Sequence, residues 1–248
     1  MTMPVAVQLY TLRDETSKDF IGTLRKVADI GYKGVEFAGF GEIKAEDMKK
    51  ALDEFGLKAV GSHTGIELLR DNFDAVAEYN LKIGNKYVIV PWAAADGKAG
   101  YEKLAQELGE IGQKLKRRGL QLCYHNHDHE FQGFDGVYGM DILLDSNKPE
   151  NLMAEIDTCW VFYAGLDPAA YVRKNKGRCP LVHVKDLKSR EEKEFAEVGN
   201  GVIDIPSVVA AAEDIGAEWI VVEQDVCRIP SLESVKISFN NLKNMGLI

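Results

Sequence analysis

The sequence predicts a single closed (β/α)8 barrel, because eight short apolar strands alternate with amphipathic helices along 248 residues. The strands are apolar on both faces, which is typical of a parallel sheet covered on both sides. The helices end at a glycine, which most easily adopts the left-handed conformation that often terminates a helix. An open doubly wound sheet would need a glycine-rich first turn, and none follows Leu9. The helix-ending glycines are Gly31, Gly56, Gly84, Gly119 and Gly216, with Gly177 similar.

Most strands are expected directly after one of these helical stretches. Apolar residues recur at helical spacing, for example at Leu104, Leu108, Ile111 and Leu115. The last two helices are expected over Asp204 to Gly216 and Ile229 to Met245, and no linker divides residues 1–248, so one domain is predicted. The strands are expected near Val5 to Leu9, Gly34 to Phe37, Leu57 to Ser62, Tyr87 to Val90, Leu120 to Tyr124, Leu152 to Ile156, Leu181 to Val184 and Trp219 to Val222.

Composition argues against nucleic acid and membrane partners. Thirty basic and 39 acidic residues give a net charge of -9, and the short run 114–118 is the one basic cluster. No apolar run approaches the roughly 18 residues of a membrane span. The first four residues do not resemble a secretion signal, so a cytoplasmic protein is expected. Four dispersed cysteines fit a reducing compartment, where we expect them to be small core residues: Cys123, Cys159, Cys179 and Cys227.

Polar residues rich in metal-ligating types follow the predicted strands, and in such barrels the carboxyl ends of the strands carry the site. Strands five to eight are neighbours, so Glu130, Asp157, His183 and Glu223 are expected to converge on one divalent ion. This oxygen-rich set suits Mn²⁺, Mg²⁺ or Co²⁺ more than structural zinc, although Zn²⁺ is tolerated. The full group is Gln8, Glu36, His63, His125 to Glu130, Glu155, Asp157, His183, Lys185, Asp186, Glu223, Gln224 and Asp225.

Several of these residues have two interpretations. If the fifth strand continues, His125, His127 and His129 share one side, as metal ligands or substrate contacts; otherwise some of them pack or face solvent. Lys185, two residues after His183, either holds a substrate oxygen or forms a salt bridge to an acid such as Asp157.

Aromatic and glycine residues near the strand ends are equally open. Trp92 and Trp160, with Phe162 and Tyr163, either wall a sugar pocket or pack in the core. The pair Gly199 and Gly201 lies where barrels often bind phosphate, but a tight turn with Asp204 as helix N-cap and Pro206 in the first turn explains the same residues.

Taken together, these motifs resemble the sugar phosphate isomerase/epimerase family, the xylose isomerase-like barrels that include inosose dehydratase and ketose 3-epimerases. The resemblance covers nearly the whole chain. The segments that carry it are Val7 to Arg13, Gly34 to Glu36, Gly61 to His63, Tyr124 to His127, Asp157 to Trp160, Val182 to Asp186, Val198 to Gly201, and Val222 with Glu223.

The resemblance implies one divalent ion held by Glu130, Asp157, His183 and Glu223. In the epimerases the first glutamate lies within strand five, where this chain has His125; Glu130 follows on the loop, as in the dehydratase-like members. Glu130 and Glu223 would correspond to the acid and base, with Glu223 the preferred base. His125 or His127 would donate or relay a proton and Lys185 would steady an oxyanion. Substrate contacts are expected from Gln8, Glu36, His63, Trp92 and Trp160.

The implied activity is isomerisation or epimerisation of a keto-sugar, sugar phosphate or inosose through an enediolate. The alternative is expulsion of a β-substituent by a lyase or dehydratase. Two other classes are weaker: a metal-dependent endonuclease, for which the chain lacks a basic groove, and a non-catalytic sugar-binding barrel, which would be expected to lose a carboxylate. A small carbohydrate is the expected partner, and homo-oligomers are common among such barrels.

Overall fold

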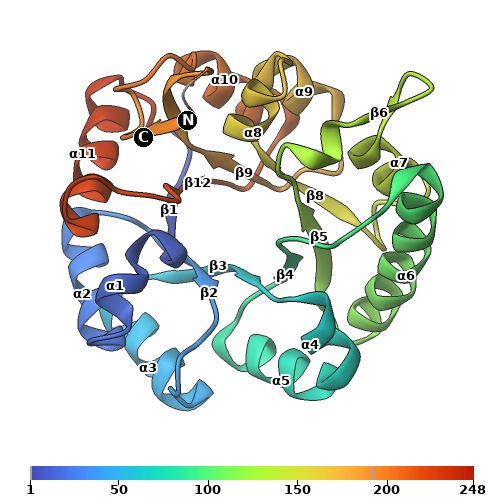
Figure 1. The fold of residues 1–248 in the computed structure, drawn as a ribbon. Helices are drawn as coiled ribbons and strands as arrows, with labels where there is room; N and C mark the ends of the chain where they lie inside the picture. The colour runs from blue at the N-terminus through green and yellow to red at the C-terminus, as the bar shows by residue number, and fades with distance from the viewer. Residues whose placement is uncertain (1, 192) are drawn as a thin grey trace.

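Eight parallel strands close into one barrel in a computed structural model, which describes residues 2–191 and 193–248 (Figure 1). Neighbouring strands follow chain order around the barrel, and β12 pairs with β1 to close it. Every predicted strand is confirmed to within one residue at either end. The strands are β1 (Val5–Gln8), β2 (Gly34–Ala38), β3 (Lys58–His63), β4 (Tyr87–Val90), β5 (Gln121–His125), β8 (Met153–Asp157), β9 (Leu181–Val184) and β12 (Trp219–Val222).

Helices form the outer ring around these strands (Figure 1). The glycines expected to stop helices have φ between 69° and 123°, as at Gly56 and Gly31. The helices are η1 (Leu9–Leu12), α1 (Arg13–Thr16), α2 (Phe20–Ile30), α3 (Ala45–Phe55), α4 (Ile66–Asp71), α5 (Phe73–Ile83), α6 (Gly97–Arg117), η2 (His129–Phe131), α7 (Gly139–Asp145), α8 (Thr158–Tyr163), α9 (Pro168–Lys174), α10 (Ile205–Ile215) and α11 (Ser231–Asn244).

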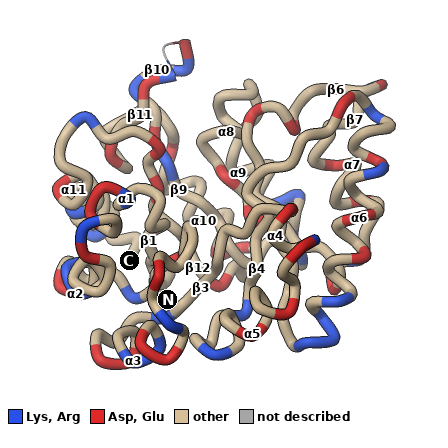
Figure 2. Tube along the Cα trace, turned by 60° about the horizontal axis from the view of Figure 1, so that its bottom comes forward, with Lys and Arg blue, Asp and Glu red and all other residues tan. Residues whose placement is uncertain are grey.

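Two small hairpins were not expected from the sequence. One pairs β6 (Gly133–Phe134) with β7 (Val137–Tyr138), after β5. The other pairs β10 (Asp186–Ser189) with β11 (Glu194–Ala196), and Figure 2 shows it projecting from the body of the barrel. Both hairpins follow the carboxyl end of a barrel strand, so they extend the face on which barrel sites are built.

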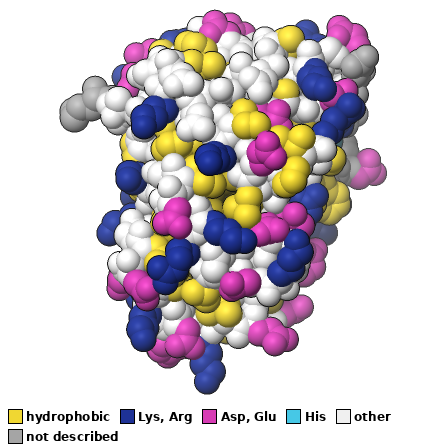
Figure 3. Space-filling model, turned by 90° about the vertical axis from the view of Figure 1, so that its left-hand side faces the viewer, with side chains coloured by type: hydrophobic (Ala, Val, Ile, Leu, Met, Phe, Trp, Pro, Cys, Tyr) yellow, Lys and Arg dark blue, Asp and Glu magenta, His cyan; other side chains and the backbone are white. Residues whose placement is uncertain are grey.

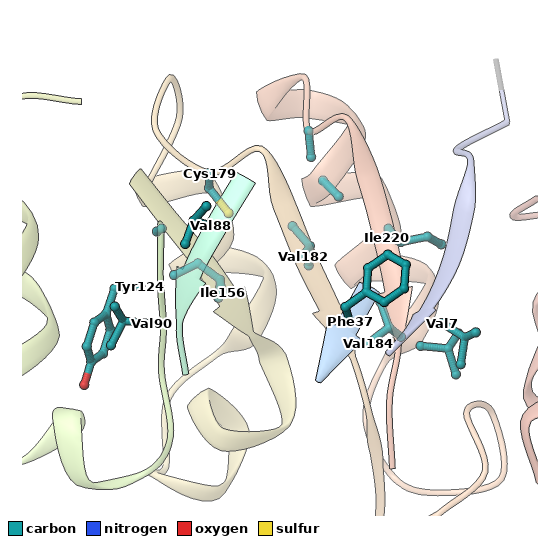
Figure 4. Packing of buried hydrophobic residues seen from close by; sticks show 14 of the residues in the cluster. Val7, Phe37, Val88, Val90, Tyr124, Ile156, Cys179, Val182, Val184 and Ile220 are labelled. Carbon is teal, nitrogen blue, oxygen red and sulfur yellow. The ribbon is translucent and has the colours of Figure 1, made fainter. Parts of the chain in front are cut away.

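The outward side chains of the strands pack against the helices to form the main core. Figure 4 shows members of this layer, including Val7, Val182 and Ile220. Removing each such side chain from water is worth about 1.5–3 kcal/mol. Side chains alternate between the two faces, so the next residue along each strand points into the barrel.

Inside the barrel, apolar residues fill the amino-terminal end and polar residues the carboxyl end. Along β9 the inward residues are Leu181 and then His183; along β5 they are Cys123 and then His125. A Cβ on Gly61 would lie 2.5 Å from Glu36 Oε1, so the glycine leaves room for that buried carboxylate. The interior thus changes from hydrophobic packing to a charged layer within one strand length.

The surface offers no continuous basic stripe on the face shown in Figure 3, where Lys and Arg alternate with Asp and Glu. Across the part of the chain that the structure describes, no helix is long and apolar enough to cross a membrane. The four cysteines are free thiols; Cys227 is partly buried and the other three are buried, as the sequence predicted for most of them.

Candidate metal centre at the carboxyl ends of the strands

The centre of the barrel contains a charged layer, here called the inner layer, made of Gln8, Glu36, His63 and Glu155. Glu36 Oε2 accepts from Gln8 Nε2 at 2.7 Å and faces His63 Nε2 at 3.1 Å. Glu155 Oε2 lies 2.8 Å from His63 Nε2 and 3.0 Å from His125 Nδ1. One oxygen of each glutamate, Oε1, is buried without a hydrogen-bond partner.

His183 connects this inner layer to the groups above it. Its Nε2 lies 2.7 Å from Glu36 Oε2, and its Nδ1 lies 2.9 Å from Glu223 Oε2. Burial alone would lower the pKa of His183, but Glu155 and Glu36 raise it well above its usual value. The pKa of His63 rises for the same reason, to about 10. Without a metal, imidazolium therefore balances the buried carboxylates.

Four ligand atoms meet at the carboxyl end of the strands, one each from His125, Asp157, His183 and Glu223. All four residues are buried, and the atoms lie within 4.8 Å of one another. A second group, which shares His125 and His183, adds His63 and Glu155 on the inner side. The first group contains three of the four residues expected to bind a metal.

Glu130, the fourth expected ligand, is not brought to this group. Its Oε1 accepts from the Tyr124 hydroxyl at 2.8 Å and its Oε2 from the His127 backbone N–H at 2.7 Å. His129 Nε2 lies 3.0 Å from Glu130 Oε1. The carboxylate therefore ties the segment after β5 together, while His125, at the strand end itself, takes the place beside Asp157.

Asp157 has two functions because it ends β8 and begins α8. Its Oδ1 accepts from the backbone N–H of Cys159 at 2.9 Å and caps the helix, so its Oδ2 is turned towards the Lys185 ammonium at 2.9 Å. Burial raises the pKa of Asp157 to about 6, against the opposing effect of Lys185.

Lys185 is fully buried among three carboxylates, and the alternative prediction of a salt bridge is the one found. Its Nζ lies 2.9 Å from Asp157, 2.8 Å from Glu223 and 3.1 Å from Asp225. Burial alone would lower its pKa, but these acids raise it well above the usual value. In return, Lys185 and His183 hold the pKa of Glu223 well below its usual value although burial opposes them. Glu223 is thus an ionised carboxylate at the cavity wall.

A cavity of about 500 Å³ opens above this group. His125 and His127 both face it, and burial lowers the pKa of each, so both imidazoles are neutral at pH 7. His127 Nδ1 is buried without a hydrogen-bond partner. The lining residues are Tyr10, Ala38, His63, Pro91, His125, His127, Trp160, Lys185, Phe195, Glu223 and Asp225.

The expected substrate contacts divide into three sets. His63 and Trp160 line the cavity, whereas Gln8 and Glu36 lie beneath it in the inner layer. Trp92 is 54% exposed and its ring lies 6.0 Å from that of His129, outside the lining. Tyr10 and Phe195 were not among the expected substrate contacts. Phe195 reaches the cavity from the unexpected β10–β11 hairpin, and its ring packs edge-on to Trp160 at 5.8 Å.

The loop after β9 folds around the Asp186 side chain. This arrangement decides whether Gly199 and Gly201 form a phosphate site or a tight turn. The Asp186 carboxylate accepts from the backbone N–H of Leu187, Gly199, Gly201 and Ile203, at 2.9 to 3.1 Å. Asp204 caps α10 by accepting from the Ser207 backbone N–H at 3.1 Å. The tight turn with an N-cap is therefore confirmed, and its N–H groups are bonded within the chain.

We predict that Gly201→Ala destabilises the protein by about 2–3 kcal/mol, because overpacking forces backbone shifts. A Cβ there would lie 2.2 Å from both Asp186 Oδ1 and Leu187 O. Urea unfolding should show this loss, whereas the control Gly133→Ala, whose Cβ meets nothing within 4 Å, should unfold like the wild type. Equal stability of the two variants would contradict the arrangement around Asp186.

Comparison with known proteins places the chain among the xylose isomerase-like TIM barrels. A sequence model of the xylose isomerase-like TIM barrel family matches residues 24–245. An inosose dehydratase of Lacticaseibacillus casei is 25% identical over 142 residues, which are 50% of this chain and 47% of that protein. The chain therefore spans about half the length of the curated relatives it matches.

Solved structures share the fold over the whole chain. A sugar phosphate isomerase/epimerase from Parabacteroides distasonis superposes with a TM-score of 0.84 at 22% identity and covers 100% of this chain and 96% of that one. The IolI protein with a bound zinc atom superposes with a TM-score of 0.76 at 14% identity and covers 98% of this chain and 97% of that one. At these identities the likeness shows a common architecture.

Proposed function

The chain belongs to the xylose isomerase-like TIM barrel family, and from that premise we propose that it is a metal-dependent isomerase or epimerase that removes a proton next to the carbonyl of a keto-sugar or inosose. The observation that carries the proposal is Glu223, an ionised carboxylate in the cavity wall that shares a four-residue donor group. The names of two similar proteins, an inosose dehydratase and a sugar phosphate isomerase/epimerase, support the proposal.

The donor group fits a divalent ion in number and chemistry. Two carboxylates and two imidazoles, from Asp157, Glu223, His125 and His183, are ligands that Mn²⁺, Co²⁺ and Zn²⁺ accept. Glu36 accepts from His183 Nε2, so that Nδ1 is left for an ion, as is usual for metal-bound histidine. The zinc atom in IolI is consistent with this assignment. His125 replaces Glu130 in the proposed ligand set.

A bound divalent ion would polarise the substrate carbonyl and so ease removal of the neighbouring proton. Glu223 is placed to take that proton, because its carboxylate is ionised and faces the cavity. Lys185 lies 2.8 Å from Glu223 and keeps this carboxylate ionised for proton removal. The Glu223 carboxyl, once it holds that proton, is placed to return it to the neighbouring carbon or oxygen, and neutral His127, whose Nδ1 is unpartnered, is placed to hydrogen-bond the substrate.

A second candidate is elimination of water, and one observation favours it. The curated relatives are inosose dehydratases, and the cavity wall includes the imidazole of His127, which lies outside the four-residue donor group. Loss of a β-hydroxyl requires a proton at the leaving oxygen, which His127 would supply after taking up a proton from solvent. Deuterium exchange with solvent reports both reactions, and a mass decrease of the sugar by one water identifies elimination.

We predict that Glu223→Gln lowers the rate of proton exchange by about 10²–10⁴-fold, the usual contribution of a general base, while sugar binding persists. The assay is solvent-deuterium incorporation by NMR on the metal-restored protein, with a panel of ketoses and inososes. Glu218 precedes the same strand at the opposite end of the barrel, so Glu218→Gln is a matched control that should exchange normally. A barrel that only binds sugar would show no exchange in any of the three proteins.

A further inference from the structure

The loop that most often holds phosphate in (β/α)8 barrels follows the seventh strand, here β9, and in this chain it already holds an anion of its own. Asp186 occupies the centre of four backbone N–H groups, from Leu187, Gly199, Gly201 and Ile203. Such a concave set of N–H groups is what a phosphate would bind. A phosphate ester would have to displace a carboxylate that is part of the folded chain.

The helix N-termini near this loop are occupied in the same way. Asp204 Oδ1 accepts from the Ser207 N–H at the start of α10, and Asp167 Oδ1 accepts from the Ala170 N–H at the start of α9. Free N–H groups at a helix N-terminus would favour an anion, but a capping carboxylate already supplies one.

The cavity itself has no cation to spare for a phosphate. Among the described residues that line it, Lys185 is the one ammonium or guanidinium, and it faces three carboxylates: Asp157, Glu223 and Asp225. A divalent ion bound among these groups would only balance their charge. His63, also in the wall, is balanced by Glu36 and Glu155.

Three cationic side chains near the rim of the cavity also have partners within the chain. Lys193 lies 3.1 Å from Asp128 and stacks over the Trp160 ring, and Arg228 pairs with Glu194 at 2.7 Å. Arg13 donates to the backbone oxygens of Tyr10 and Asp225. The remaining surface is aromatic: Tyr10, Trp160 and Phe195 border the cavity and offer faces against which an uncharged sugar ring can pack.

We propose that the site takes an uncharged keto-sugar or inosose and excludes its phosphate ester, an inference that rests on the proposed function. Aspartates of the chain already accept hydrogen bonds from the N–H groups that a phosphate would bind. The buried Lys185 ammonium is surrounded by three carboxylates. Placing a dianion in this cavity leaves its charge unpaired, so the phosphate ester should bind at least about tenfold more weakly than the free sugar.

The first test is direct binding to metal-free wild-type protein. Inorganic phosphate and fructose 6-phosphate are titrated separately and followed by ³¹P NMR line width. We expect no saturable broadening with either compound. Saturable binding of either one at millimolar concentration or below would overturn the inference, because it would reveal an anion site that the described contacts do not provide.

The second test uses the metal-restored enzyme and pairs each sugar of the panel with its monophosphate. We expect solvent-deuterium exchange with a free sugar and at least about tenfold slower exchange with its ester. An ester that exchanges as fast as its free sugar, or faster, would refute the inference. If no compound exchanges, the proposed function fails, while the phosphate titration still decides whether the site excludes phosphate.

A third measurement asks whether Asp186 is what fills the N–H cluster. In Asp186→Ala the four N–H groups are freed, so inorganic phosphate should raise the melting temperature of the variant but not of the wild type. Asp53→Ala, on the exposed face of α3, removes the same charge without opening such a cluster and is the control. A phosphate response in wild type and control alike would contradict the assignment, and if Asp186→Ala does not fold, the wild-type titration remains decisive.

Discussion

His183→Ala is expected to bind no divalent ion and to lose turnover by about 10²–10³-fold, equivalent to roughly 3–4 kcal/mol of charge stabilisation. His183 is the residue through which the two layers of the site are joined, with Glu36 on one ring nitrogen and Glu223 on the other. Removing the imidazole therefore removes a ligand and leaves two buried carboxylates facing an empty space.

The measurement is elemental analysis of purified protein after soaking with Mn²⁺ and desalting, followed by the exchange assay. His129→Ala is the matched control, because His129 lies in the same histidine-rich segment but outside both donor groups. The control should keep one ion per chain, and chelated wild type should resemble His183→Ala. Metal bound to His183→Ala at wild-type stoichiometry would place the ion elsewhere and remove the basis of the proposed mechanism.

The barrel was predictable because its signals are local. Each barrel strand is a short apolar run, six of the eight strands follow a helix and a glycine with positive φ, and the eight barrel strands lie within one residue of their expected ends. The β10–β11 hairpin was not predictable, because its pairing depends on contacts that the loop makes after the barrel has closed. Lys193 stacking on Trp160 and Phe195 packing on the same ring are such contacts.

The site residues that lie in a strand or directly after it could be predicted from the sequence. His183 and Lys185 are two residues apart and both contact Glu223, as the alternation of side chains requires. Glu130 lies five residues beyond the end of β5, where the chain no longer follows the strand, and its direction is set by Tyr124 and the His127 N–H. Sequence position alone therefore could not choose between His125 and Glu130 as the group beside Asp157.

The same reasoning explains why the phosphate interpretation of the loop 198–204 could not be settled from the sequence. Glycines that let backbone N–H groups converge are equally suited to a ligand's phosphate and to a carboxylate of the chain. The deciding residue, Asp186, lies 13 positions before Gly199, and only the fold brings the two together.

Lys185→Met is expected to destabilise the metal-free protein by about 3–5 kcal/mol, the cost of breaking a buried ion pair by removing one partner. Asp157, Glu223 and Asp225 would then face one another without their cation. The pKa values of Asp157 and Glu223 would rise in the folded state, since Lys185 now lowers both of them. A folded acid with a raised pKa binds protons more tightly than the unfolded chain does, so the variant should regain stability as the pH falls from 7 towards 5.

Urea unfolding of metal-free protein at pH 7 and pH 5 measures both effects. Lys86→Met is the control, because Lys86 also contacts a carboxylate, Glu218 at 2.8 Å, but is 58% exposed. An exposed pair of this kind contributes at most about 1 kcal/mol, so the control should change little at either pH. If Lys185→Met and the control lost equally little stability, the three carboxylates would not depend on Lys185 for their charge balance. Lys185 would then not explain why Glu223 is ionised and ready to remove a proton.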